Sequence, residues 1–321
     1  MSETKRALVT GATGGVGGEV AAALLRHGWH VRGLARDPAK ARRSGPAGVE
    51  WVRGDAMAEA DVVAAAGGAS VVFHGANPPG YRNWRGLAIP MLRHAVSAAE
   101  AAGARLIYPG NVYVYGPDAG AVAAEDAPQR PRTRKGRIRV EMEEILRDAA
   151  ARGLRTLVVR AGDFFGPRAP SSWVSIVLLG GGGALRRVVT PERPGVGHAW
   201  AYLPDLAEAV ALLADQEAAL PAEERLHFGG HYLPGRGMAE AVRRVEGGTL
   251  PIRGFRWLPV YLGAPFATFL REVIEMRYLW QVPLRLDNAR LAALLGQEPH
   301  TPLDAAVRAS RDALKAGPLP R

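Results

Sequence analysis

The sequence predicts an α/β protein with a doubly wound parallel sheet and a smaller, mostly helical C-terminal part. Six short apolar runs alternate with helical patterns over residues 7–167, which is typical of parallel strands joined by right-handed helical crossovers. Residues 226–228 are expected to add a seventh strand. After Pro167 the alternation stops, and residues 232–314 have helical patterns separated by short loops.

The most informative stretch is a glycine-rich turn, Thr10–Gly17, directly behind the apolar run Ala7–Val9. Gly11 permits the tight turn, Gly14 lets the backbone approach a ligand, and Gly17 lets the following helix pack against the strand. A helix N-terminus offers unpaired N–H groups and a positive dipole end to a diphosphate. The turn therefore predicts a dinucleotide site, whose candidate contacts are Gly11, Thr13, Gly14, Gly15, Val16 and Gly17.

The residue after the second strand distinguishes the two nicotinamide dinucleotides. An acid there holds the adenosine ribose hydroxyls of NAD, whereas an arginine pairs with the 2′-phosphate of NADP. The second predicted strand, His30–Ala35, ends without an acid and is followed by Arg36. Arg36 therefore favours NADP(H) over NAD(H), the alternative being a solvated arginine in an arginine-rich chain.

Further candidate contacts follow the third and fourth strands, because loops at the carboxyl ends of parallel strands line the ligand crevice. Asp55 is placed either to meet the adenine amino group or to cap the next helix. Gly75 and Ala76 would let a cofactor lie against bare backbone. His74 ends an apolar strand, which is more typical of a core histidine than of a catalytic base. The candidates in these loops are Asp55, Ala56, Gly75, Ala76 and Asn77.

Composition excludes several kinds of site and partner. The chain has 321 residues, enough for a large core without a metal or a disulfide, and it contains no cysteine. His227 and His231 have a spacing that a metal could use but lack partners, so we expect no metal site. The net charge is +10, but the basic residues are spread along the chain and are mostly arginine. We therefore expect no nucleic-acid partner.

The apolar stretch Trp257–Leu270 is interrupted by Pro259, Gly263 and Pro265. It is shorter than the roughly 18 to 20 residues that a membrane-spanning helix needs. We interpret it as core or as a lid over a pocket, with contact to a membrane surface as the alternative. No apolar leader precedes the first strand, so we expect a cytoplasmic protein without a membrane partner.

Five segments carry a resemblance to a known family: Thr10–Gly17, Val114–Pro117, Arg160 with Gly166 and Pro167, Tyr202–Ala207, and Asp287–Asp304. Together they resemble the extended short-chain dehydrogenase/reductase superfamily, in the branch called NAD-dependent epimerase/dehydratase-like. The resemblance implies a Rossmann domain, residues 1–167 with 201–230, and a substrate-binding lobe, residues 168–200 with 231–321. We expect a small-molecule substrate, and a homodimer is one expected assembly.

The chemistry of that family rests on a Ser/Thr–Tyr–Lys set, with the tyrosine and the lysine four residues apart on one side of a helix. This chain does not contain the Tyr-x-x-x-Lys pattern. Aligning Val140–Leu146 with the family's helix puts Lys135 at the tyrosine position and Arg139 at the lysine position. A register shifted by two places gives Thr133 and Arg137 instead and restores no tyrosine.

Two interpretations of this helix remain. In the first, Arg139 holds the nicotinamide ribose, and Lys135 is an unconventional proton donor whose pKa is lowered by its cationic neighbour. In the second, both residues belong to a solvated basic segment that begins at Arg130.

The serine position of the family falls on Asn111, and Tyr113 lies two residues later. A tyrosine outside the usual helix is an alternative source of the acid, and Tyr113, Tyr115 and Tyr81 are the candidates. The catalytic candidates are therefore Asn111, Tyr113, Lys135 and Arg139.

Extended members of the family that act on nucleotide sugars place an arginine just before an aromatic-x-Tyr segment, to bind the diphosphate. Here that position is filled by Gly197–Trp200, and His198 cannot give the permanent bidentate grip of an arginine. Nearby aromatic residues predict a more apolar ligand, the alternative being that they pack in the core. The substrate candidates are Tyr81, Asp163, Phe164, Trp173, His198 and Trp200.

Three functional hypotheses follow. The first is an NAD(P)(H)-binding oxidoreductase or epimerase-like enzyme that acts on a small carbonyl or hydroxyl substrate with a non-standard acid/base set. The second is a non-catalytic NADP(H)-sensing regulator of the same fold, for which the missing tyrosine argues. The third is a nucleotide-sugar epimerase or dehydratase in which the usual residues have been replaced.

Overall fold

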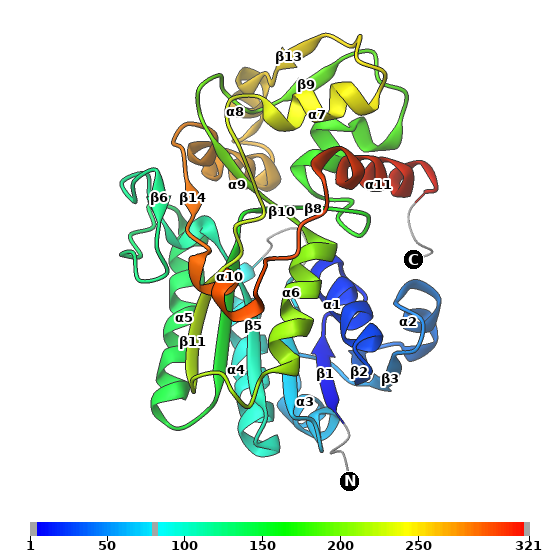
Figure 1. Cartoon of the computed structure of the whole chain (residues 1–321), viewed down its shortest axis with the longest axis vertical. Helices are drawn as coiled ribbons and strands as arrows, with labels where there is room; N and C mark the ends of the chain where they lie inside the picture. The colour runs from blue at the N-terminus through cyan, green and yellow to red at the C-terminus, as the bar shows by residue number, and fades with distance from the viewer. Residues whose placement is uncertain (1–4, 79–82, 318–321) are drawn as a thin grey trace.

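The computed structural model describes residues 5–78 and 83–317. This part of the chain forms a central sheet of seven parallel strands in the order β11-β7-β5-β4-β1-β2-β3 (Figure 1). The strands are β1 (Arg6–Thr10), β2 (His30–Ala35), β3 (Glu50–Arg53), β4 (Val71–His74), β5 (Arg105–Asn111), β7 (Thr156–Ala161) and β11 (Glu223–His227). The doubly wound α/β fold predicted from the sequence is confirmed, and β11 is the expected seventh strand.

Helices cover both faces of the sheet because alternate strand residues point to opposite sides. In β4, Val71 and Phe73 face one layer of helices and Val72 faces the other. The first layer contains α1 (Gly15–Arg26), α2 (Pro38–Ser44), α6 (Leu203–Asp215) and α10 (Ala289–Leu295). The second layer contains α3 (Glu59–Ala66), α4 (Trp84–Ala102) and α5 (Arg134–Ala151).

A smaller region lies over the carboxyl ends of the central strands, at the top of Figure 1. Its own apolar core is built around Phe165, Trp200 and Trp280. Its helices are α7 (Gly237–Val245), α8 (Trp257–Gly263), α9 (Thr268–Glu275) and α11 (Leu303–Lys315). Its short strands are β8 (Asp163–Phe165), β9 (Val188–Thr190), β10 (His198–Tyr202), β12 (His231–Leu233) and β13 (Ile252–Gly254).

The order of the central strands reverses between β1 and β4, where the chain leaves one half of the sheet and enters the other. Thr10, the last residue of β1, pairs with His74 of β4 and with Leu34 of β2. Open α/β sheets bind ligands at such a reversal, outside the carboxyl ends of the strands. In the described ranges, no helix is both long enough and apolar enough to cross a bilayer.

Candidate functional site

Three glycines bring the β1–α1 turn into direct backbone contact with the end of β4. Gly11 has a φ of +72°, and a Cβ atom there would lie 2.5 Å from the carbonyl oxygen of Gly75. A Cβ atom on Gly17 would lie 2.4 Å from the carbonyl oxygen of Gly11. Gly75 is less constrained, because Thr10 O lies 3.0 Å from its Cβ position, which is a tight contact. At Gly11 and Gly17 no larger residue fits without moving the backbone.

Gly14 is less confined and lies at the surface. A Cβ atom there would have one close neighbour, the Gly11 carbonyl oxygen at 3.2 Å, and both Thr13 and Gly14 are exposed. Gly14 is the N-cap of α1, yet no side chain caps the helix and no acid stands in its first turn. The N–H groups and the positive dipole end of α1 therefore lack a side-chain partner at an accessible surface. This arrangement suits an anion such as a diphosphate.

The residues after β2 and β3 are accessible to a ligand at this edge of the sheet. Arg36 is exposed directly after β2, and Asp37 next to it caps α2 by accepting a hydrogen bond from the Lys40 amide at 3.0 Å. Asp55 accepts a hydrogen bond from the Met57 amide through Oδ1, also at 3.0 Å. Asp55 therefore supports a turn through one carboxylate oxygen, while the cap of α3 is Ala58. Half-buried Ala56 follows.

The loop after β4 contacts Trp84, and Trp84 in turn contacts Arg139 of α5. Asn77 accepts a hydrogen bond through Oδ1 from the indole N–H of Trp84, at 2.8 Å, while Gly75 and half-buried Ala76 precede it. The guanidinium of Arg139 lies over the Trp84 ring, 4.9 Å from its centroid, and donates to the Tyr108 hydroxyl. Arg139 is thus only partly exposed, and aromatic rings from α4 and β5 hold it in place.

Lys135, which the sequence suggested either as an unconventional proton donor or as part of a solvated segment, is buried in an ion pair with α9. Its side chain is 2% exposed, and Nζ donates to the Glu272 backbone carbonyl at 2.8 Å and pairs with Glu272 Oε2 at 3.2 Å. Burial, rather than a cationic neighbour, is the main cause that lowers the pKa of Lys135, and the Glu272 carboxylate opposes it. We therefore correct the proposed role: Lys135 links α5 to α9, and Arg139 does not set its pKa.

A chain of hydrogen bonds connects Tyr113, Asp163 and His198. The Tyr113 hydroxyl donates to Asp163 Oδ1 at 3.3 Å, and Asp163 Oδ2 lies 3.0 Å from His198 Nε2. Asn111 positions Tyr113, because its side chain accepts the Tyr113 backbone N–H at 3.1 Å and caps the 3₁₀ turn that holds the tyrosine. The three side chains come from the turn after β5, from β8 and from β10, so the fold brings together residues far apart in the sequence.

Both ring nitrogens of His198 have a partner. Nδ1 lies 3.2 Å from the Leu279 carbonyl oxygen, and Nε2 lies 3.0 Å from Asp163 Oδ2. Both partner oxygens can accept a hydrogen bond from the ring. His198 is therefore held in place on both sides, and its contact with Asp163 is a hydrogen bond.

Trp200 and Trp173, two of the aromatic residues predicted to contact substrate, pack in the core of the smaller region. Trp200 is fully buried, and Trp173 packs edge-on against Trp280 with ring centroids 5.3 Å apart. Phe164 is half-buried against the core under the sheet. The alternative of core packing describes Trp200 and Trp173 better than direct contact with a ligand. Tyr81, the remaining candidate, lies outside the described residues.

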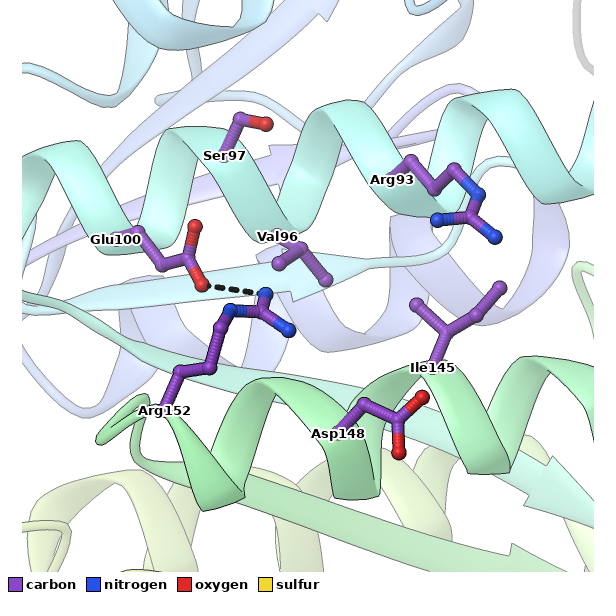
Figure 2. Close-up of a pocket in the computed structure, with 7 residues that line it drawn as sticks. All are labelled: Arg93, Val96, Ser97, Glu100, Ile145, Asp148 and Arg152. Atoms are coloured by element: carbon purple, nitrogen blue, oxygen red, sulfur yellow. Dashed lines mark hydrogen bonds and ion pairs between the residues drawn. The ribbon is translucent and has the colours of Figure 1, made fainter.

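A cavity of about 170 Å³ opens on the outer surface between α4 and α5 (Figure 2). Charged side chains dominate its lining, and Arg152 forms an ion pair with Glu100 at 2.8 Å across it. Ile145 and Val96 form its apolar floor. None of the residues singled out from the sequence lines this cavity, so it is separate from the predicted site.

A family model described as "NAD dependent epimerase/dehydratase family" matches residues 7–229. The chain belongs to this family. The resemblance inferred from the motifs is therefore confirmed, and the open β1–α1 turn lies within the matched region. No protein with a curated description matches the chain in sequence.

Solved structures of the same fold extend over nearly the whole chain. UDP-glucuronic acid 4-epimerase from Bacillus cereus in complex with NAD has a TM-score of 0.76 and 17% identity, covering 97% of this chain and 96% of that one. UDP-glucose-4-epimerase from Stenotrophomonas maltophila, with bound NAD and formylated UDP-arabinopyranose, has a TM-score of 0.76 and 18% identity, covering 98% of each. MoeE5 in complex with UDP-glucose and NAD has a TM-score of 0.74 and 21% identity, covering 97% and 99%. At these identities the likeness shows the fold.

Sequence reasoning missed Glu272, Trp84 and Tyr108 in this family member. Glu272 lies on α9, more than a hundred residues after Lys135 and outside every motif, so only the folded chain reveals the pair. Trp84 and Tyr108 hold Arg139, and they looked like ordinary apolar residues of a helix and a strand. Their positions relative to Arg139 follow from the packing of α4 and α5 on β5, which no local pattern specifies.

His74 is buried near Arg139. We therefore expect the free energy of unfolding to depend on pH. Burial lowers the pKa of His74 from 6.5 to about 3, and Arg139 adds to the effect. Between these pH values the unfolded chain binds a proton at His74 and the folded protein does not, so stability falls as pH falls, by about 1.4 kcal/mol per pH unit. Lowering the pH from 7 to 5 should cost about 2 kcal/mol through this residue.

Urea unfolding at pH 7 and pH 5 measures this effect. His74→Gln should reduce the acid-induced loss of unfolding free energy by about 2 kcal/mol relative to the parent protein. Equal losses in the parent and His74→Gln proteins would contradict the assignment of a buried neutral imidazole.

Proposed function

We propose that this protein binds a nicotinamide dinucleotide at the β1–α1 turn and is an oxidoreductase or epimerase-like enzyme for a small carbonyl or hydroxyl compound. In this proposal Tyr113 is the acid/base group. The observation that carries it is the hydrogen-bonded array of Tyr113, Asp163 and His198, beside the carboxyl ends of β5 and β7. The array provides an exchangeable proton next to the position where the family has its serine.

The β1–α1 turn fits the diphosphate of such a cofactor. The open space at Gly14 and the uncapped first turn of α1 support binding through the backbone at Thr13, Gly14, Gly15 and Val16. Arg139 would lie toward the nicotinamide ribose, held by Trp84 and Tyr108. The chemistry that a bound nicotinamide supplies is hydride transfer to or from a substrate carbon.

Tyr113 is the group that would exchange a proton with the substrate oxygen. In this step the hydroxyl would turn from Asp163 Oδ1 and give its proton to a carbonyl oxygen that is being reduced, and the Asp163–His198 pair would then return a proton to Tyr113 Oη. In the reverse direction the phenol oxygen takes the proton and passes it back to the carboxylate. Tyr113 is half-buried, whereas Asp163 and His198 are almost fully buried, so the tyrosine is the member nearest to a ligand.

The residues of the array also indicate whether the substrate carries a diphosphate. Sugar-nucleotide substrates carry two phosphates, which need cationic partners. His198 stands at the position where such members of the family have an arginine, and here it is committed to Asp163. The Asp163 carboxylate would itself repel a phosphate. We therefore infer a substrate without a diphosphate, unlike the UDP sugars named with the structural neighbours.

A non-catalytic dinucleotide sensor is the second candidate function. It is favoured by Lys135, which occupies the family's tyrosine position and is paired with Glu272, so α5 supplies no phenolic acid. The two candidates differ in whether bound NAD(P)H is oxidised when carbonyl compounds are added.

Tyr113→Phe tests the enzyme proposal. Without the hydroxyl, turnover of an aldehyde or ketone substrate should fall by about 10² to 10⁴-fold, while affinity for the dinucleotide stays within a few-fold. The assay follows NAD(P)H absorbance over a panel of small aldehydes and ketones, with fluorescence titration for the affinity. Tyr261→Phe, at a half-exposed tyrosine on α8, is the matched control and should keep full turnover.

Two outcomes would contradict the proposal. Unchanged turnover in Tyr113→Phe would remove Tyr113 as the acid/base group. Tight binding of NAD(P)H by the parent protein with no oxidation by any compound of the panel would favour the sensor.

We further propose that NADP(H) is preferred over NAD(H), because Arg36 is exposed at the end of β2 with no acid at the strand end. Arg36→Gln should weaken NADPH binding by about tenfold, since it removes one charge-assisted contact to the 2′-phosphate, and should leave NADH binding unchanged. Titration of both nucleotides measures this. The structural neighbours are named with NAD, so a preference for NAD(H) is the alternative. If the parent protein binds NADH more tightly than NADPH, the proposed preference for NADP(H) is wrong.

A further inference from the structure

An apolar surface on α8 and α9 is exposed to solvent. Among the described residues, eight large apolar side chains are exposed, and five of them fall within residues 258–269. Phe266 is 91% exposed, Leu258 68% and Leu262 66%. Single exposed apolar residues are ordinary, but a cluster of this kind marks an interaction site. The members of this surface, which we call the α8–α9 face, are Leu258, Tyr261, Leu262, Phe266 and Phe269.

The inner side of α9 carries an acid, while an aromatic ring of the same helix is exposed. A helix on a soluble protein usually buries its apolar stripe and exposes its charges. In α9 the fully buried residue is Glu272, while Phe269 is 55% exposed and Leu270, Val273 and Ile274 are half-buried. Glu272 pairs with Lys135, and Glu275 accepts the backbone N–H of Lys135 at 3.0 Å. These contacts fasten the inner side of α9 to α5 and leave Phe269 at the surface.

Arginines outnumber acids in the segment that contains the α8–α9 face. Residues 251–277 contain four arginines and two acids. The acids are Glu272 and Glu275, both engaged with α5. Arg253, Arg256 and Arg271 are exposed. The fourth arginine, Arg277, lies over the rings of Trp257 and Tyr261. This segment therefore combines exposed apolar side chains with an excess of positive charge.

We propose that the α8–α9 face docks on a membrane surface that contains anionic lipids. The apolar side chains would enter the boundary between headgroups and acyl chains, and the arginines would meet lipid phosphates. The two helices have seven and eight residues, so they would lie at the interface rather than span it. A second copy of this chain fits less well, because a symmetric contact would bring arginines against arginines with no acid between them.

Docking on a membrane surface is the alternative that the sequence left open for residues 257–270. A core position is excluded by the exposure of Leu258, Leu262 and Phe266. A lid over a pocket would turn these side chains inward, whereas here the inward side of α9 is occupied by Glu272.

Sedimentation of the 321-residue protein with lipid vesicles tests the proposal. The parent protein should bind vesicles of phosphatidylcholine with phosphatidylglycerol more strongly than vesicles of phosphatidylcholine alone, and added salt should weaken the binding. The double variant Leu262→Ser/Phe266→Ser should lower the partition coefficient at least about tenfold. Ile176→Ser is the matched control, because Ile176 is 51% exposed but lies outside the face, and it should bind like the parent.

A second double variant separates charge from apolar insertion. Arg253→Gln/Arg256→Gln should remove the preference for phosphatidylglycerol, with thermal unfolding confirming that each variant is folded. The proposal is overturned if the parent binds neither kind of vesicle or if Leu262→Ser/Phe266→Ser binds as well as the parent. It is also overturned if light scattering detects a dimer of the parent protein that the same double variant dissolves, since the face would then serve self-association.

Discussion

The close approach of the β1–α1 turn to the end of β4 is the constraint on which the rest of the site depends. At Gly11 and Gly17 the backbones lie so near that no Cβ atom fits, and at Gly75 a Cβ atom would be in tight contact. This contact sets the direction in which α1 leaves the sheet and places its first turn at an accessible surface. Gly14, in the same turn, is not confined in this way. One short segment therefore contains glycines required for packing and a glycine that leaves room for a ligand.

The chain lacks the Tyr-x-x-x-Lys pattern that supplies the acid/base group in its family. In the alignment through Val140–Leu146, the family's tyrosine position on α5 falls on Lys135, which forms a buried ion pair with Glu272. Removing one partner of such a pair is costly, so both residues are under structural constraint. We propose that the exchangeable proton belongs instead to the array of Tyr113, Asp163 and His198. Under the proposed function, the acid/base group lies in the loop after β5 rather than on the helix, and α5 anchors α9.

The central fold could be predicted because the sequence patterns that indicate it lie within short segments of the chain. The alternation of apolar runs with helical patterns and the spacing of Gly11, Gly14 and Gly17 are both properties of short segments, and they identified the sheet and its first turn. The side-chain environments could not be predicted, since they depend on which distant segment packs beside each residue. Lys135 looked accessible until Glu272 was placed beside it, and Trp200 looked like a ligand contact although it is fully buried.

Calorimetric titration with NADPH and NADH is the most direct test of the claim that the open turn at Gly14 binds a diphosphate. The parent protein should give saturable heat with at least one nucleotide, and Gly14→Ala should weaken that binding by about tenfold or more at nearly unchanged thermal stability. Gly254→Ala, whose Cβ would meet nothing within 4 Å, should bind like the parent. No heat with either nucleotide, or equal affinity in Gly14→Ala and the parent, would contradict the claim.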